Sequence, residues 1–208
     1  MKKAKQTADY YNKQSHKYDR IYRSYLGHTH QKLLEQIEIQ QGGTVLDCSA
    51  GTGLLAGELL QKFDISRLVL NDPAGDMLSK AKKRLEYAEP EIVFTNYFAE
   101  ELDQLHPEMF DHIICLNSFH YYVDQSRVVS NFQKLLKPGG SLWLLDWNRT
   151  GFFVINSKLI DWFSPMNINT RTLDEMEALL NTRKLSVDEK ATWGFRLWNF
   201  FYMRATLM

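Results

Sequence analysis

Short apolar runs alternate with amphipathic stretches along the middle of the chain. The runs are typical of buried strands, and the stretches between them have the apolar spacing of helices. We expect strands at 44–47, 67–71, 91–95, 110–117 and 141–146, and helices at 54–63, at 73–87 and ending at Leu135–Leu136. Because strands and helices take turns, the pattern predicts a parallel sheet with right-handed crossovers.

Residues 5–40 precede this alternation and predict two helices. The first carries a stripe of tyrosines at helical spacing, namely Tyr11, Tyr18, Tyr22 and Tyr25. Two interpretations are open for the stripe: it packs on the core of the main domain, or it forms a cap over a pocket.

The stretch 147–169 breaks the alternation and is rich in Trp and Phe. It follows the last expected parallel strand, where a lid over an apolar or aromatic substrate would lie. A helix packed on the core is an equally good interpretation.

The carboxyl-terminal part predicts one more helix and a hairpin. Thr172 and Glu175 have the spacing of a capping box at a helix start. Two β-rich runs follow at 185–193 and 197–206, and we expect a turn at Gly194 to join them as antiparallel strands.

A turn of small residues after the first strand carries the most specific signal. The run Val45–Leu55 has a strand, then Gly51 and Gly53, then a helix beginning at Leu54. Glycines let the backbone bend and let a ligand approach, and the N–H groups at a helix start favour an anionic group. Asp47, at the strand end, suits a ligand that also carries a positive group.

Two kinds of ligand compete for this turn. Residues 51–56 satisfy the dinucleotide fingerprint G-x-G-x-x-G/A, and Asp72 lies near the expected distance downstream. However, an acid and extra turn residues precede Gly51, where a dinucleotide site usually has an apolar strand. The whole run resembles the first motif of class I S-adenosylmethionine (SAM) methyltransferases, V-L-D-x-G-x-G-T-G, with Ser49 in place of the usual first glycine.

Further motifs resemble the type 11 methyltransferases and the ubiquinone/menaquinone C-methyltransferases. The tyrosines and aspartate of 10–19 resemble their opening Y-Y…Y-D pattern, which closes over SAM in that family. Residues 72–78 resemble D-x-S-x-x-M-L, residues 116–124 resemble the segment L-H-H-x-x-D, and residues 136–142 resemble L-K-P-G-G-x-L.

The resemblance implies an α/β fold: a three-layer, Rossmann-like, seven-stranded sheet, mostly parallel, with a carboxyl-terminal antiparallel hairpin and an N-terminal helical cap. We therefore expect a cap at 1–40 and a SAM-binding domain at 41–208, with an aromatic lid at 147–169.

The implied cofactor is SAM, and the implied product is S-adenosylhomocysteine (SAH). Asp72 would accept the ribose hydroxyls, and Met77 would pack beside adenine unless it is ordinary core. The family has an acid at the position of Phe98, so Phe98 packs against adenine or a backbone group makes the polar contact. The cofactor-binding residues that we expect are Tyr11, Tyr18, Asp47, Ser49, Ala50, Gly51, Gly53, Asp72, Pro73, Met77, Ala99, Glu100 and Asn117.

Methyl transfer needs a general base only if the acceptor must lose a proton. His120 is our candidate, because it follows the fourth strand and imidazole titrates near neutral pH; a histidine bonded to backbone is the competing interpretation. Tyr121, Tyr122 and Asp146 are second choices. Asp146 with Asn148 is a thin basis for a metal-assisted site, and we predict no metal.

The composition of the chain limits the classes of partner that we expect it to bind. Twenty-five basic residues balance 25 acidic ones, so the chain lacks the positive surplus of a nucleic-acid binder. Cys48 and Cys115 lie in or at the end of apolar strands, which favours buried thiols, and no apolar run is long enough to span a membrane. We expect a cytoplasmic SAM-dependent methyltransferase that acts on an apolar or aromatic small molecule, with no nucleic-acid partner and no membrane span. A non-catalytic SAM-binding protein and, less favoured, an RNA methyltransferase are the alternatives; the acceptor and the oligomeric state stay open.

Overall fold

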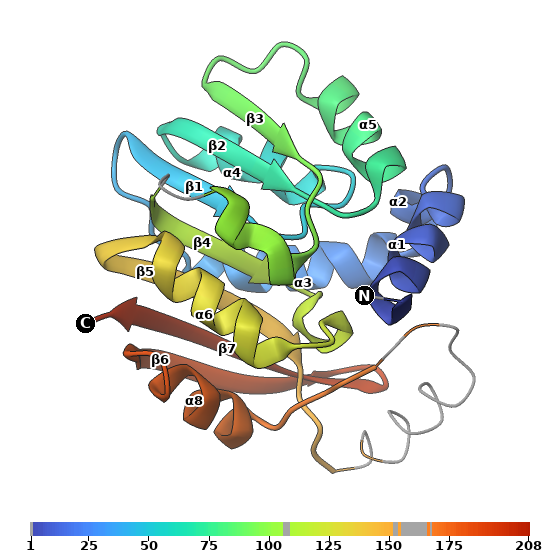
Figure 1. Ribbon diagram of the computed structural model, residues 1–208. Helices are drawn as coiled ribbons and strands as arrows, with labels where there is room; N and C mark the ends of the chain where they lie inside the picture. Colours follow the sequence, from blue (N-terminus) through green and yellow to red (C-terminus); the bar gives the residue numbers. More distant parts are fainter. Residues whose placement is uncertain (1, 106–108, 152–153, 155–165, 167) are drawn as a thin grey trace.

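The computed structural model describes residues 2–105, 109–151, 154, 166 and 168–208. Within them a seven-stranded sheet has the order β3-β2-β1-β4-β5-β7-β6 (Figure 1). Its strands are β1 (Gly43–Asp47), β2 (Ile65–Asn71), β3 (Glu91–Thr95), β4 (Phe110–Leu116), β5 (Leu136–Trp147), β6 (Leu185–Phe195) and β7 (Trp198–Leu207). Neighbouring strands from β3 to β5 are parallel, whereas β7 is antiparallel to both β5 and β6.

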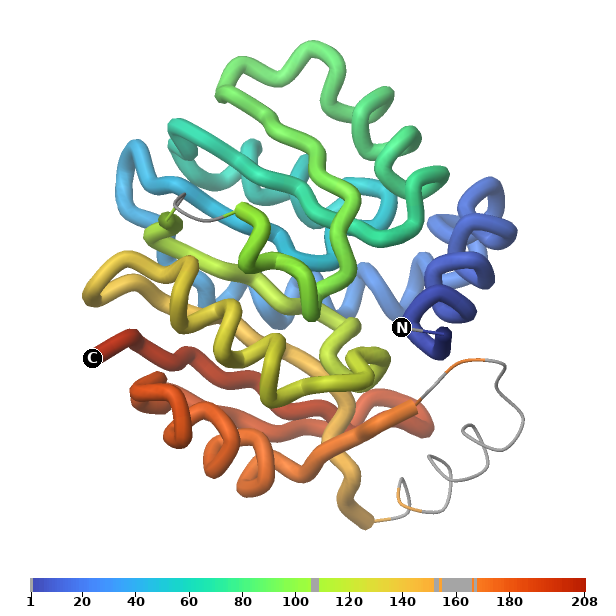
Figure 2. The backbone as a smooth tube through the Cα atoms, viewed as in Figure 1, coloured from blue at the N-terminus to red at the C-terminus, as the bar shows by residue number. Residues whose placement is uncertain are grey.

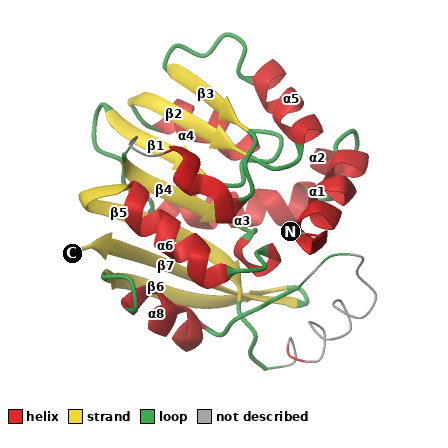
Figure 3. Ribbon diagram, in the orientation of Figure 1, coloured by secondary structure: helices red, strands yellow, loops and turns green. Residues whose placement is uncertain are grey.

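Helices cover both faces of the sheet, which gives three layers (Figure 3). The described helices are α1 (Lys2–Gln14), α2 (Tyr18–Ile21), α3 (Arg23–Gln36), α4 (Leu54–Lys62), α5 (Gly75–Arg84), α6 (Gln125–Leu135) and α8 (Leu173–Asn181), with short 3₁₀ helices η1 (Ala99–Leu105) and η2 (Phe119–Tyr121). One core lies between the sheet and α6, α8 and η1; the other lies between the sheet and α3, α4 and α5. Alternate residues of β4 enter opposite cores, Ile113 the first and Ile114 the second.

The strand order places a crevice at one edge of the sheet. The chain passes from β1 outward to β2 and β3, then returns to β4 on the other side of β1. Ligands of open α/β sheets bind at such a switch point, outside the carboxyl ends of the strands. Helices α1 and α2 lie beside this edge, whereas α3 runs behind the sheet (Figures 1 and 2).

The predicted fold class and the predicted strands are confirmed. The N-terminal segment forms three helices rather than two, because the chain bends between Gln14 and Tyr18 and again at Tyr22. The hairpin turn is at Arg196–Leu197 and not at Gly194: Gly194 still pairs with Asn199, and Arg196 takes the positive φ.

Two expectations about organisation stay predictions. Most of the proposed lid at 147–169 lies outside the described residues. The boundary between a cap at 1–40 and the main domain is also undecided, because Leu33 of α3 is fully buried in the core beneath the sheet. No described helix is both long and apolar enough to cross a bilayer.

Candidate functional site

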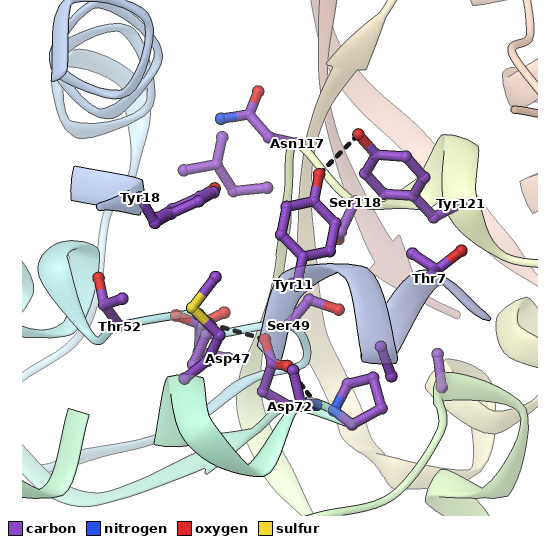
Figure 4. Close-up of a pocket in the computed structure, with 18 of the residues that line it drawn as sticks. Thr7, Tyr11, Tyr18, Asp47, Ser49, Thr52, Asp72, Asn117, Ser118 and Tyr121 are labelled. Atoms are coloured by element: carbon purple, nitrogen blue, oxygen red, sulfur yellow. Dashed lines mark hydrogen bonds between the residues drawn. The ribbon is translucent and has the colours of Figure 1, made fainter. Parts of the chain in front are cut away.

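A pocket opens at the carboxyl edge of the sheet, between the N-terminal helices and the turns that follow β1, β2 and β4 (Figure 4). Its empty space is about 980 Å³, including open solvent at the mouth.

The glycine turn forms one wall of the pocket. Gly51 has φ +55° and Gly53 has φ +72°, in the left-handed region that favours glycine. A Cβ on Gly53 would lie 2.9 Å from the Cβ of Ala81, so Gly53 lets α5 pack closely against the turn. A Cβ on Gly51 would meet no atom within 4 Å, which leaves room for a ligand against the backbone.

Two buried carboxylates line the pocket, one from each of two neighbouring strands. Asp72 Oδ2 accepts the N–H of Gly51 and Oδ1 accepts the N–H of Ala74, both at 2.8 Å. Each oxygen keeps a further lone pair for a ligand. Burial raises the pKa of Asp47 to about 7, against a hydrogen bond from the backbone of Ser49, and raises the pKa of Asp72 to about 6.

The pocket therefore has acids without a cation to balance them. No Lys or Arg is among the described residues that line it. A positively charged ligand would favour the ionised forms of Asp47 and Asp72, which burial alone disfavours. The site is electrostatically suited to an ammonium or sulfonium group.

Ser49, at the position of the family's usual glycine, has a partner of its own. Its hydroxyl lies 2.8 Å from the hydroxyl of Tyr122, which also lies 3.0 Å from Ser118 Oγ and 3.3 Å from Cys48 Sγ. Cys48 and Cys115 are free and buried. Tyr122 thus joins the glycine turn to the turn after β4.

Tyrosines from α1 and α2 cover the other side of the pocket. Tyr11 donates a 2.7 Å hydrogen bond to the hydroxyl of Tyr121, and the Tyr11 ring meets Tyr18 edge to face at 5.8 Å (Figure 4). The three residues all line the cavity. Of the tyrosine stripe predicted from sequence, Tyr11 and Tyr18 line the pocket, whereas Tyr25 packs against Trp198 and Phe200; the role of the stripe as a cap stays a prediction.

A polar clamp fastens this cover to the glycine turn. Thr52 Oγ1 donates to Asp19 Oδ1 at 2.6 Å, and Arg84 Nη2 lies 2.7 Å from Asp19 Oδ2. Arg84 also donates to the carbonyl of Thr52. Sequence analysis missed this clamp, since its members are far apart in the chain and only the fold brings them together.

Asn117 follows β4 with φ +55°, a conformation that Asn tolerates better than most residues. Its Oδ1 accepts from Tyr25 at 2.9 Å and its Nδ2 donates to Thr29 Oγ1 at 2.8 Å, so α3 fixes it. Tyr25 in turn accepts a hydrogen bond from Trp147 Nε1.

His120 is buried behind the pocket rather than on its described lining. Its Nδ1 lies 2.5 Å from Asp146 Oδ1, its backbone N–H donates to Asp146 Oδ2, and its ring stacks on Trp147 at 3.9 Å. Nε2 has no hydrogen-bond partner among the described residues. Its role as a base stays a prediction.

Of the expected cofactor-binding residues, all but Gly53 line the pocket; Gly53 lies behind it, against Ala81. Phe98 lines the cavity as well. Glu100 uses Oε1 to accept the N–H groups of Val123 and Asp124. No three His, Cys, Asp or Glu side chains in the described part of the chain are grouped to hold a metal.

Comparison with known proteins identifies related sequences. Residues 46–142 match the family model described as a methyltransferase domain. The chain is similar to the ubiquinone biosynthesis O-methyltransferase of Coxiella burnetii, with 31% identity over 120 residues, which are 57% of this chain and 49% of that protein. The match thus spans about half the length of this curated relative.

Solved structures share the fold. A chain of the complex that contains the Haloferax volcanii Trm112 methyltransferase activator matches with a TM-score of 0.81 and 16% identity, over 95% of this chain and 97% of that one. Magnesium protoporphyrin IX methyltransferase from Synechocystis, with bound SAH, matches with a TM-score of 0.70 and 16% identity, over 90% of this chain and 84% of that one.

Proposed function

We propose that this chain transfers the methyl group of SAM to a small-molecule acceptor and releases SAH, in keeping with the methyltransferase-domain model that its residues 46–142 match. Bound SAM supplies an electrophilic methyl carbon, and its transfer forms a bond to the acceptor while the carbon–sulfur bond breaks. The protein has to align the two reactants and keep out water.

The observation that carries the proposal is the pair of buried carboxylates, Asp47 and Asp72, beside the bent turn at Gly51. SAM and SAH each carry an ammonium group and a ribose, which suit these two acids. The open space in front of Gly51 gives the ligand direct access to the backbone. Phe98 and Met77 offer apolar surface for the adenine ring.

The acceptor side of the pocket is formed by phenol groups and apolar side chains, including Tyr11, Tyr121 and Leu26. This lining supports an apolar or aromatic small molecule, in keeping with the name of the Coxiella burnetii relative. The balanced charge of the chain gives no support to a nucleic-acid acceptor.

Isothermal titration with SAH tests the cofactor. Wild type should bind SAH at micromolar concentration or better, and no binding at millimolar SAH would overturn the proposal. Gly51→Asn is the matched perturbation, since Asn tolerates positive φ and its side chain would occupy the ligand's space. We expect SAH affinity to fall at least tenfold.

Gly139→Asn is the control, because Gly139 also has positive φ and open space but lies in the turn before the main part of β5, off the pocket lining. It should bind SAH like wild type.

A non-catalytic SAM-binding protein of this fold is the second candidate, and the buried position of His120 favours it. Incubation with SAM and a panel of phenols and catechols, followed by measurement of SAH release, separates the two. SAH formation that depends on an acceptor supports transfer; tight SAM binding without SAH release across the panel supports the alternative.

A further inference from the structure

The hydroxyl proton of Tyr121 has no hydrogen-bond acceptor among the described residues and lies in the pocket. A phenol hydroxyl has one proton to donate and lone pairs with which to accept. Tyr11 fills one lone pair of Tyr121 at 2.7 Å, and no described residue accepts the proton of Tyr121. The hydrogen bond from Tyr11 therefore leaves the Tyr121 proton free for a ligand.

Three polar side chains near Tyr121, namely Asn117, Ser49 and Ser118, already have hydrogen-bond partners. Asn117 is bonded through both its amide oxygen and its amide nitrogen. Ser49 and Ser118 both bond to Tyr122. Tyr121 lies across the pocket from Asp72 (Figure 4), so its proton is offered to the acceptor and not to the ribose.

Tyr121 stays a donor throughout the physiological range. Burial raises the pKa of Tyr121 well above its usual value, against the hydrogen bond from Tyr11. Its ring is held in place by Tyr11, at 5.6 Å, and by His120, at 4.0 Å. His120 is itself fixed by Asp146, so the phenol is set on a rigid base.

Building on the proposed function, we propose that Tyr121 selects an aromatic oxygen acceptor by donating a hydrogen bond to its phenolate oxygen. A phenolate oxygen has several lone pairs, so it can accept this bond and still present another pair to the methyl carbon. A neutral amine has a single lone pair, which the same bond would occupy. Tyr121 is thus a specificity-determining residue that favours oxygen over nitrogen.

A pair of chromophores of matched shape tests this inference without turnover. Each protein is saturated with SAH and titrated at pH 8 with 4-nitrophenol, which is then largely phenolate, or with 4-nitroaniline. Wild type should bind the phenolate at least tenfold more tightly than the aniline. Tyr121→Phe lacks the charged hydrogen bond to the phenolate oxygen, so it should bind the phenolate about tenfold more weakly than wild type.

The absorption band of the bound phenolate is a second readout, since a donor at the oxygen moves the band to shorter wavelength. We expect the band at longer wavelength in Tyr121→Phe than in wild type. Tyr87→Phe is the matched control, because Tyr87 is 90% exposed and should change neither affinity nor band.

The outcomes separate the two proposals. SAH binding with equal phenolate affinity in wild type and Tyr121→Phe overturns the inference alone, as does wild type that binds the aniline as well as the phenolate or binds neither. Loss of SAH binding by wild type overturns the proposed function instead. If Tyr121→Phe fails to fold, the comparison of the two probes on wild type still decides.

Discussion

Protonation of the buried acids should control cofactor affinity. Asp47 titrates at about 7 and Asp72 at about 6 in the free protein, because burial disfavours their charged forms. In the proposed complex the ammonium of SAH favours ionised Asp47, and the ribose hydroxyls donate to ionised Asp72. The free protein therefore carries protons on these acids that the complex lacks. The affinity for SAH is at its maximum above pH 8 and falls as the pH drops through 7 and then 6.

The size of the effect follows from these two pKa values. If binding requires both acids ionised, SAH should bind about 20-fold more weakly at pH 6 than at pH 8, a loss of about 2 kcal/mol. Isothermal titration at half-unit steps between pH 5.5 and 8.5 measures it.

Asp47→Asn supplies the control for this titration. The amide keeps the shape of the side chain but cannot ionise, so only Asp72 should remain to titrate. The variant should bind SAH more weakly at pH 8 and lose only about twofold more affinity by pH 6. An affinity in wild type that does not change with pH, or a variant with the full pH dependence of wild type, would refute the reasoning.

Three further predictions concern the glycine turn and its surroundings. Asp47→Asn should raise the unfolding free energy of the free protein by about 1–3 kcal/mol at pH 8 but should not raise it at pH 4. The folded-state pKa of Asp47 lies above the ordinary value, so ionisation of Asp47 destabilises the folded wild type as pH rises; urea unfolding at both pH values checks this. Gly53→Ala should cost about 2–4 kcal/mol through its positive φ and the contact with Ala81, against about 1 kcal/mol for Gly139→Ala; equal losses in urea would contradict this. Asp19→Ala should weaken SAH binding roughly three- to tenfold by freeing Thr52 and Arg84 from the clamp, and an unchanged Kd would show that the clamp has no role.

The places of the parallel strands along the chain could be predicted because each strand is a short apolar run and the stretches between them have helical periodicity, whereas the seven-stranded arrangement came from the resemblance. The capping box at Thr172 is confirmed, with Glu175 bonded in both directions. These signals are local, so the sequence carries them without knowledge of the fold. The hairpin turn was placed two residues too early because Gly194 is the better turn former by composition, yet the pairing of Phe195 with Trp198 leaves Arg196 and Leu197 to make the turn.

The pocket residues next to the glycine turn could be predicted because they come from two short continuous segments, the first motif at 45–55 and the end of β2 with Asp72. The clamp at Asp19 could not be predicted from the sequence, because its partners Thr52 and Arg84 come from two other parts of the chain. The bond between Ser49 and Tyr122 is a similar case. Ser49 stands where the motif of the resembled family has glycine, so from the sequence alone it is only a departure from the motif. In the folded chain its hydroxyl is bonded to Tyr122 in the turn after β4.

In the turn after β4, two neighbouring side chains of different chemical type have different surroundings. His120 attracts attention because imidazole titrates near neutrality, whereas Tyr121 beside it does not. Neighbours in the 3₁₀ turn η2 point in different directions, and the fold turns His120 toward Asp146 and Tyr121 toward the pocket. Nε2 of the histidine has no hydrogen-bond partner among the described residues, while the phenol lines the pocket and its proton has no described acceptor. The direction of His120 follows from its bond to Asp146, which only the packed sheet can form, and it leaves Tyr121 as the side chain of this pair that lines the pocket.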